Sequence, residues 1–160
     1  MFVIDLASRR VHIVASTPHP NELFMCQVGR TLTGADEGVL GGHRVLICDR
    51  DAKWSAHVRE RLGEAGIRVV QTPYQAPNAN AYAERFVRSI KEECLGRVIP
   101  FGERHLRRTI AEFIEHYHRE RNHQGLENAL IDGAPASERG GRIHRRQRLG
   151  GLLNYYARAA

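Results

Sequence analysis

Two acidic residues are the strongest candidates for chemistry in this sequence. Asp49 stands directly after the apolar run Val45–Cys48, and Glu84 opens a predicted helix behind a segment rich in Asn and Pro. The 34 residues between them, 50–83, leave room for a helix, a strand and a loop that return the chain to its starting edge. Two carboxylates from different elements, lying beside basic side chains, are suited to bind a divalent metal that acts on a phosphodiester.

Further charged residues accompany each acid. Arg88 and Lys91 follow Glu84 at spacings of four and seven, so a helix places all three on one stripe; the alternative is a solvent-exposed, salt-bridged face. An acid at the end of a buried strand carries a desolvation cost, which favours a functional role for Asp49. Asp51 lies on the same side of an extended chain and is either a rival ligand or a turn residue.

The elements that must position these residues follow from apolar spacing, caps and turn signals. The predicted order is β-β-α-β-α-β-α-α, which indicates an α/β domain. Asn21 and Ser55 are suited to cap helices, and Gly66 to end one. The predicted segments are a hairpin of 1–4 with 11–15, a helix after Asn21, a buried central strand at 45–48, a helix after Ser55, a strand at 67–72, and helices at about 80–98 and 103–121.

The amino-acid composition indicates which class of molecule the protein binds. The net charge is +6, and all but two of the 24 basic residues are arginines, which bind phosphates bidentately. We therefore expect a polyanionic partner, the alternative being a merely basic soluble protein. Three scattered cysteines without a C-x-x-C pair indicate no disulfide framework and a reducing compartment. No apolar stretch approaches the roughly 20 residues of a membrane span.

Several other residues have structural alternatives. Asn78 and Asn80 are suited to turns and caps. Alternation along the strand directs Cys48 away from Asp49 and into the core. Three histidines lie near one another in sequence but lack the ligand spacing of a zinc site, so we expect them at the surface or facing nucleic acid: His116, His118 and His123.

The C-terminal segment differs from the rest of the chain. Residues 139–148 are basic and contain glycine, and residues 149–160 include Tyr155 and Tyr156. The basic run either contacts the backbone of a nucleic acid or forms a solvated, disordered tail. We divide the chain into a domain at 1–127 and a basic, partly disordered tail at 128–160.

Three ordered motifs carry a resemblance to a known family. They are V-L-I-C-D-R-D-A-K-W from Val45, G-I-R-V-V-Q-T-P-Y-Q-A-P-N-A-N-A-Y-A-E-R-F from Gly66, and Y-H-R-E-R-N-H-Q-G-L from Tyr117. Together they resemble the integrase catalytic core of bacterial insertion-sequence transposases, which are relatives of retroviral integrases. The resemblance extends from about Phe2 to Leu126.

The resemblance implies a ribonuclease-H-like fold, with a mixed sheet flanked by helices, and DNA strand transfer by a D,D,E triad with two Mg²⁺ or Mn²⁺ ions. One metal activates water or a DNA 3′-hydroxyl, and the other stabilises the leaving oxygen. Asp49 matches the second acid, Glu84 matches the glutamate, and Lys91 matches a basic DNA contact. The implied protein is bacterial, cytoplasmic and nucleoid-associated, and forms a homo-oligomer on DNA without a membrane. The remaining DNA-binding candidates are Arg85, Arg88, Asn78 and Asn80.

The first acid of the triad has no clear match. Asp5 lies in a V-I-D-x-x-S-R-R segment that resembles the second strand of the family and its turn, whereas the catalytic aspartate lies on the strand before it. We therefore expect an N-terminally truncated core that lacks the first strand and is weak or inactive alone. Two alternatives stay open: a non-catalytic remnant that binds DNA or oligomerises, and a nuclease on the same fold with Asp5 as a substitute acid.

Overall fold

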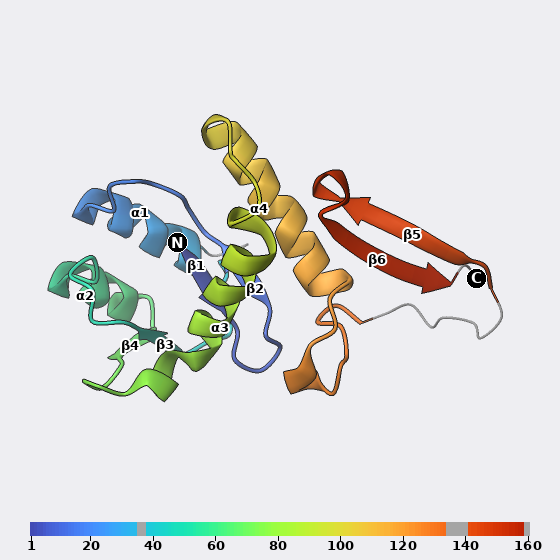
Figure 1. Cartoon of the computed structure of the whole chain (residues 1–160). Helices are drawn as coiled ribbons and strands as arrows, with labels where there is room; N and C mark the ends of the chain where they lie inside the picture. The colour runs from blue at the N-terminus through green and yellow to red at the C-terminus, as the bar shows by residue number, and fades with distance from the viewer. Residues whose placement is uncertain (35–37, 134–140, 159–160) are drawn as a thin grey trace. The chain divides into compact units, whose positions relative to one another are not determined.

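The computed structural model describes residues 1–34, 38–133 and 141–158, and Figure 1 labels its helices and strands. The chain divides into two compact units. The N-terminal unit comprises Met1–Ile4 and Val11–Ala83, and the C-terminal unit comprises Asp5–Arg10 and Glu84–Ala160. The main elements are β1 (Phe2–Ile4), β2 (Val11–Ile13), α1 (Glu22–Thr33), β3 (Val45–Cys48), α2 (Ala56–Glu64), β4 (Arg68–Gln71), α3 (Ala81–Ile90), α4 (Gly102–Arg119), β5 (Ile143–Arg148) and β6 (Leu153–Arg158).

The helices of the N-terminal unit begin where the sequence predicts. The Asn21 side chain accepts a hydrogen bond from the Phe24 backbone N–H at 2.9 Å, and Ser55 accepts one from the Val58 N–H at 3.3 Å. Each side chain thereby satisfies a backbone donor that has no partner within the helix. Gly66 follows α2 with a φ of +81°, a conformation that favours glycine, and the chain then enters β4.

The core of the N-terminal unit lies between α1, α2 and the parallel pair β3–β4. Strand β3 pairs with β4 in parallel, with Val45 opposite Arg68 and Cys48 opposite Gln71. Burial of the apolar side chains supplies the driving force for this packing. The core side chains are Met25, Val28, Leu32, Leu40, Leu46, Cys48, Trp54, Val58, Leu62 and Ile67.

The C-terminal unit is built around α3 and α4. Phe86 of α3 packs edge-on against Tyr117 of α4, with ring centroids 5.3 Å apart, and Phe113 lies 5.8 Å from Tyr117. Edge-to-face contacts of this kind favour aromatic clusters beyond their buried area. Cys94, which follows α3, is fully buried, as the helical pattern predicts.

Residues 143–158 form an antiparallel hairpin where the sequence pattern gave no strand signal. Strand β5 pairs with β6 from Ile143 opposite Arg158 to Arg148 opposite Leu153. The Leu149 N–H donates to Glu112 Oε2 of α4 at 3.1 Å, and Leu153 is buried. The basic segment is therefore ordered over these residues. Residues 134–140 and 159–160 of the predicted tail lie outside the described part. The predicted boundary between a domain at 1–127 and a tail at 128–160 stays a prediction.

The α/β prediction is confirmed, but a single mixed sheet is absent from the described residues. The structure contains three two-stranded sheets, β1–β2, β3–β4 and β5–β6. The prediction of a buried central strand at 45–48 is wrong for two of its four residues. Alternation buries Leu46 and Cys48 in the core, whereas Val45 and Ile47 are 41% and 43% exposed because they point to the other face.

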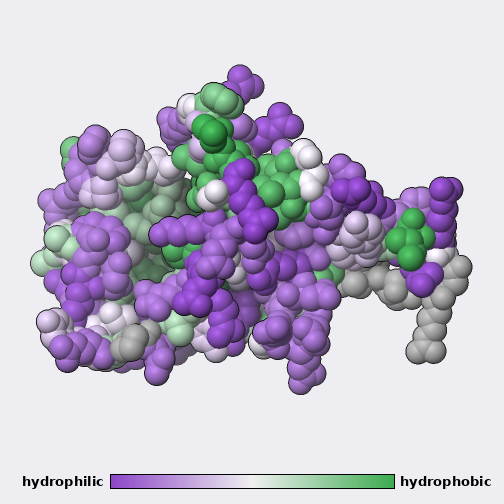
Figure 2. All heavy atoms as spheres, in the orientation of Figure 1, coloured by the Kyte–Doolittle hydropathy of each residue, from purple (hydrophilic) through white to green (hydrophobic). Residues whose placement is uncertain are grey.

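The visible surface is largely hydrophilic, with a hydrophobic area where α4 begins (Figure 2). Ile99 and Phe101, just before α4, are 78% and 81% exposed. Among the described helices, none combines the length and apolar character that a membrane crossing requires.

Candidate functional site

Asp49 lies at the carboxyl end of β3, where the loop is attached to the neighbouring strand. The Thr72 N–H continues the β3–β4 ladder by donating to the Cys48 carbonyl at 2.9 Å. Arg50 Nε donates to the Thr72 carbonyl at 2.8 Å, which holds the residue after Asp49 against the end of β4. Asp49 therefore leaves the sheet at a fixed edge, the edge where ligands bind in parallel α/β sheets.

The Asp49 carboxylate is paired with Lys53 rather than buried. The Lys53 ammonium lies 3.2 Å from Asp49 Oδ2 and 3.0 Å from Asp51 Oδ2, so one cation contacts both acids. The Asp49 side chain is 49% exposed, so the predicted desolvation of this acid is wrong. The pKa of Asp51 is lowered, first by the Lys53 backbone N–H and then by the Lys53 side chain.

Cys48, beside Asp49, is a core residue. It is 5% exposed, and burial raises the pKa of its thiol, which keeps the sulfur protonated and poorly nucleophilic. This confirms the prediction that Cys48 packs in the core.

Glu84 opens the exposed stripe of α3. Arg88 and Lys91 follow it and are also exposed. In the described part of the chain, the structure records no ion pair for any of the three, although Glu84 and Arg88 stand four residues apart. Helix α4 shows the contrast: Arg107 pairs with Glu103 at the same spacing, at 2.6 Å. The described contacts therefore give no support to the salt-bridged interpretation of the α3 stripe.

A π-helical turn, Lys91–Leu95, follows α3 and begins at Lys91. The Gly96 N–H donates to the Lys91 carbonyl at 2.7 Å, which widens the turn by one residue. A Cβ atom at position 96 would lie 2.7 Å from the same carbonyl oxygen, so this close approach requires glycine. Such turns recur at functional sites because they displace a side chain from the regular helical face.

The other predicted DNA contacts also lie on or next to α3. Arg85 is exposed on α3 itself. Asn78 and Asn80 belong to the 3-10 turn Pro77–Asn80 that leads into the helix; Asn78 is exposed and Asn80 is half-buried. The backbone carbonyl of Asn78 accepts the Ala81 N–H, so this residue has the turn role that its type favours.

Asp5 is engaged in the turn between β1 and β2. Its Oδ1 accepts hydrogen bonds from the Ser8 backbone N–H at 2.6 Å and from Ser8 Oγ at 2.8 Å. Among the described residues, no group of three or more His, Cys, Asp or Glu side chains is arranged to hold a metal ion. The carboxylate oxygens of Asp49 and Glu84 are chemically suited to Mg²⁺ or Mn²⁺. The two residues belong to different units, and their convergence stays a prediction.

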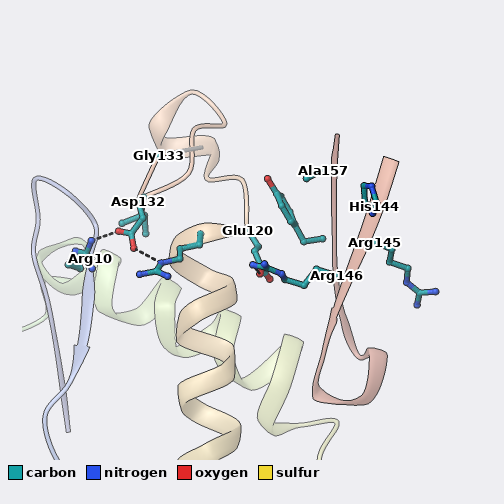
Figure 3. A pocket seen from close by; sticks show the side chains of 11 residues that line it. Arg10, Glu120, Asp132, Gly133, His144, Arg145, Arg146 and Ala157 are labelled. Carbon is teal, nitrogen blue, oxygen red and sulfur yellow. Dashed lines mark hydrogen bonds and ion pairs between the residues drawn. The ribbon is translucent and has the colours of Figure 1, made fainter. Parts of the chain in front are cut away.

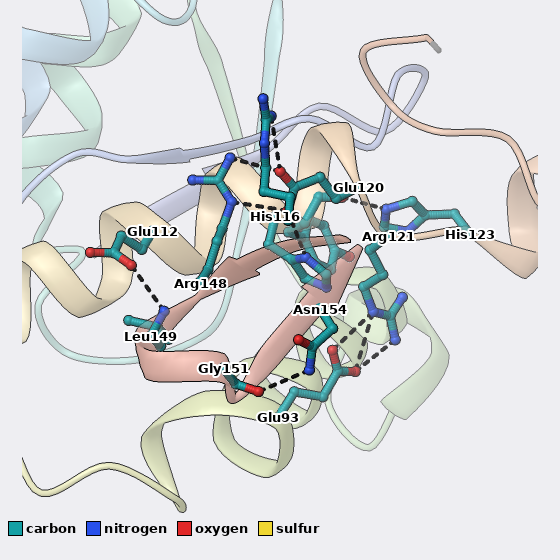
Figure 4. Close-up of polar contacts among 12 residues, drawn as sticks. Glu93, Glu112, His116, Glu120, Arg121, His123, Arg148, Leu149, Gly151 and Asn154 are labelled. Carbon is teal, nitrogen blue, oxygen red and sulfur yellow. Dashed lines mark hydrogen bonds and ion pairs between the residues drawn. The ribbon is translucent and has the colours of Figure 1, made fainter. Parts of the chain in front are cut away.

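The three clustered histidines are buried, so the prediction of surface or nucleic-acid-facing histidines is wrong. His116, His118 and His123 are 8%, 5% and 8% exposed. His123 Nε2 lies 2.7 Å from the Tyr117 carbonyl and therefore donates its proton to that oxygen (Figure 4). Burial lowers the pKa of His123, because the charged imidazole would lose its hydration. The histidines are placed by hydrogen bonds that their sequence spacing does not reveal.

A buried carboxylate, Glu120, connects α4 to the C-terminal hairpin. Arg148 donates from Nε and NH2 to its two oxygens at 2.9 and 2.8 Å, and His116 Nδ1 lies 3.0 Å from Oε2 (Figure 4). Burial alone would raise the pKa of Glu120, but hydrogen bonds from Arg148 and His116 outweigh it and lower the pKa. Sequence reasoning missed this contact because no sequence signal pairs residues 28 positions apart.

A pocket of about 1020 Å³ lies within the C-terminal unit between the end of α4, residues 131–133 and the hairpin (Figure 3). Asp132 pairs with both Arg10 and Arg119 on one side of it. Arg146 pairs with Glu120 on the other. Each of these three arginines contacts a carboxylate, whereas Arg145, which also lines the pocket, donates to the neutral Asn154.

Comparison with known proteins gives one family. A sequence model of the integrase core domain matches residues 65–129. This segment is similar in sequence to integrase core domains. The match confirms the resemblance to an integrase or transposase catalytic core. It includes Glu84 and the basic stripe of α3, but it begins at residue 65, after Asp49. Neither the curated proteins nor the solved structures contain a match to this chain.

Proposed function

We propose that this protein acts on DNA in integration or transposition, as a metal-dependent strand transferase. In this proposal Asp49 and Glu84 bind Mg²⁺ or Mn²⁺, on a ribonuclease-H-like arrangement that includes β3, β4 and α3. Lys91 contacts the DNA backbone together with Arg85, Arg88, Asn78 and Asn80, and the chain assembles as a homo-oligomer on DNA.

The match of residues 65–129 to the integrase core carries the proposal. Within that segment, the exposed stripe of Glu84, Arg88 and Lys91 supports it, because the described contacts leave these charges available to a ligand. Lys53 gives the predicted metal site a specific property. A metal at Asp49 must displace the ammonium that this carboxylate now contacts, so protein and metal compete for the same oxygens.

Calorimetric titration of Mn²⁺ into the full chain tests this site. Asp49→Asn and Glu84→Gln should each abolish binding without changing the melting temperature, since both side chains are exposed. Lys53→Met should tighten binding, because it removes the competing ammonium, whereas Lys53→Arg keeps the charge and should stay near wild type.

A strand-transfer assay on the same samples tests the chemistry. Metal-dependent joining that disappears in Asp49→Asn and Glu84→Gln would support the proposal. Activity unchanged in both variants would rule out these residues as the ligands. Binding of DNA without any metal-dependent product would instead support the second candidate.

The second candidate is a non-catalytic DNA-binding protein on the same fold. One observation favours it: the Lys53 ammonium contacts the carboxylates of both Asp49 and Asp51, oxygens that a metal would need. A nuclease that recruits Asp5 is less favoured, since Asp5 Oδ1 already accepts two hydrogen bonds in its turn.

A further inference from the structure

The two faces of the β5–β6 hairpin use their arginines differently. Side chains alternate across a strand, so His144, Arg146 and Arg148 lie on one face and Ile143, Arg145 and Gln147 on the other. Arg146 and Arg148 both contact the buried carboxylate of Glu120. The first face, the inner face, thus holds its charge in an internal ion-pair network that attaches the hairpin to α4.

The arginines of the outer face are held by neutral groups. Arg145 Nε donates to Asn154 Oδ1 at 2.8 Å, and Asn154 is itself fixed by its amide donating to the Gly151 carbonyl at 2.8 Å. Arg158 NH1 donates to the Gly141 carbonyl at 3.1 Å. Figure 3 shows the Arg145 side chain directed away from Glu120 and Arg146. Each guanidinium is oriented, yet its charge is not cancelled by these contacts.

Exposed apolar side chains lie beside these cations. Tyr156 stands opposite Arg145 in the ladder and is 61% exposed, and Ile143 stands opposite Arg158 and is 58% exposed. Residues 141–158 contain five arginines and no aspartate or glutamate. An oriented arginine pair beside an exposed aromatic ring, on a ribbon without acids, matches the surface that a polyanion requires.

We propose that the outer face of the β5–β6 hairpin is a DNA-backbone-binding surface, separate from the carboxylate site. Arg145 and Arg158 bind phosphates, and Tyr156 and Ile143 contact the adjoining sugars. The choice of DNA rests on the proposed function, but the binding itself requires neither Asp49 nor Glu84. The inner face has the structural role, because its arginines are committed to Glu120.

Salt-dependent binding tests this surface. Fluorescence anisotropy of a labelled 30-base-pair duplex with the full chain in EDTA, between about 50 and 200 mM NaCl, measures the slope of log affinity against log salt. Each phosphate contact contributes about 0.9 to that slope, so Arg145→Gln with Arg158→Gln should reduce it by about 1.8. The loss of affinity over this salt range should then be roughly 12-fold smaller than in wild type.

A matched variant separates this effect from net charge. Arg30→Gln with Arg61→Gln removes two exposed arginines from the N-terminal unit and should leave the slope at its wild-type value. Arg158→Gln alone, which removes a hydrogen bond to the Gly141 carbonyl, should lower the slope by about 0.9 without changing the melting temperature.

Two results would overturn the proposal. One is a slope in the double variant equal to that of wild type. The other is a double variant that loses affinity for duplex RNA but keeps its affinity for duplex DNA, which would assign the surface to RNA. Because the assay contains no divalent metal, a failure of strand transfer at Asp49 and Glu84 would leave this result standing, and the reverse is also true.

Discussion

At the scale of single residues, the role of a charged or titratable side chain in this protein depends on the groups that it contacts. The Lys53 ammonium forms ion pairs with both Asp49 and Asp51. The Glu84 side chain, by contrast, is exposed on α3. His123 shows the opposite case, a titratable group used for structure, since its ring lies edge-on to Tyr117 with centroids 4.6 Å apart.

The lowered pKa of His123 predicts a loss of stability in mild acid. The neutral ring is favoured in the folded state, so its contribution is complete above the unfolded pKa of 6.5 and declines as pH falls through the lower, folded value. Urea unfolding between pH 8 and 5.5 should show this decline. His123→Gln keeps a donor for the Tyr117 carbonyl and should flatten the slope.

Exposed His57 on α2 supplies the control for this measurement. His57→Gln should leave the pH dependence as in wild type. A wild-type pH slope in His123→Gln would show that another group titrates in this range.

At the scale of elements, the attachment of the β5–β6 hairpin to α4 is largely ionic. Glu120 has a side chain only 1% exposed, and Arg148 covers it with two hydrogen bonds. Removing one member of a buried pair leaves the other charge without compensation.

Glu120→Gln should therefore lower the free energy of unfolding by about 3 kcal/mol or more. Glu115→Gln on the same helix is the matched control. Glu115 pairs with Arg119 at 3.4 Å but is 47% exposed, so the loss should stay below about 1 kcal/mol. Denaturant titration measures both, and equal small losses would show that Glu120 contributes no more than a surface pair.

The sequence predicted elements well where a local signal exists. Asn21 and Ser55 cap their helices as expected, and the apolar run at Val45–Cys48 is a strand with the predicted bounds. Strand β5 escaped prediction because its inner face packs through arginines on Glu120. Hydrophobic alternation, the usual strand signal, is therefore absent from it.

The candidate site was predictable only in part. The motif around Glu84 lies in the segment that matches the integrase core, so its family context could be found from sequence. The exposure of Asp49 and its contact with Lys53 depend on a loop held by Arg50, which leaves no local pattern. Spacing alone also placed His116 at the surface, because a buried imidazole needs a partner that only the fold supplies.

At the scale of the whole molecule, the two units have separate cores. The N-terminal core contains Trp54, and the C-terminal core is the aromatic group around Tyr117. The ionic attachment through Glu120 belongs to the second unit only.

Hydrogen exchange should resolve this division. Glu120→Gln should speed amide exchange in β5 and β6, because the hairpin loses its main attachment, while amides of β3 and β4 keep their wild-type rates. Mass spectrometry of peptic fragments measures both regions. An equal acceleration in all four strands would show that the units unfold together.

The turn between β1 and β2 affects how the protein can be divided into recombinant fragments. Residues 5–10 belong to the C-terminal unit although the strands on either side belong to the N-terminal one, and Arg10 pairs with Asp132. A recombinant fragment that starts at residue 84 would therefore leave Asp132 with Arg119 as its remaining recorded ion-pair partner. Such a fragment also lacks residues 5–10, so a cut in the chain before residue 84 does not coincide with the boundary between the two units.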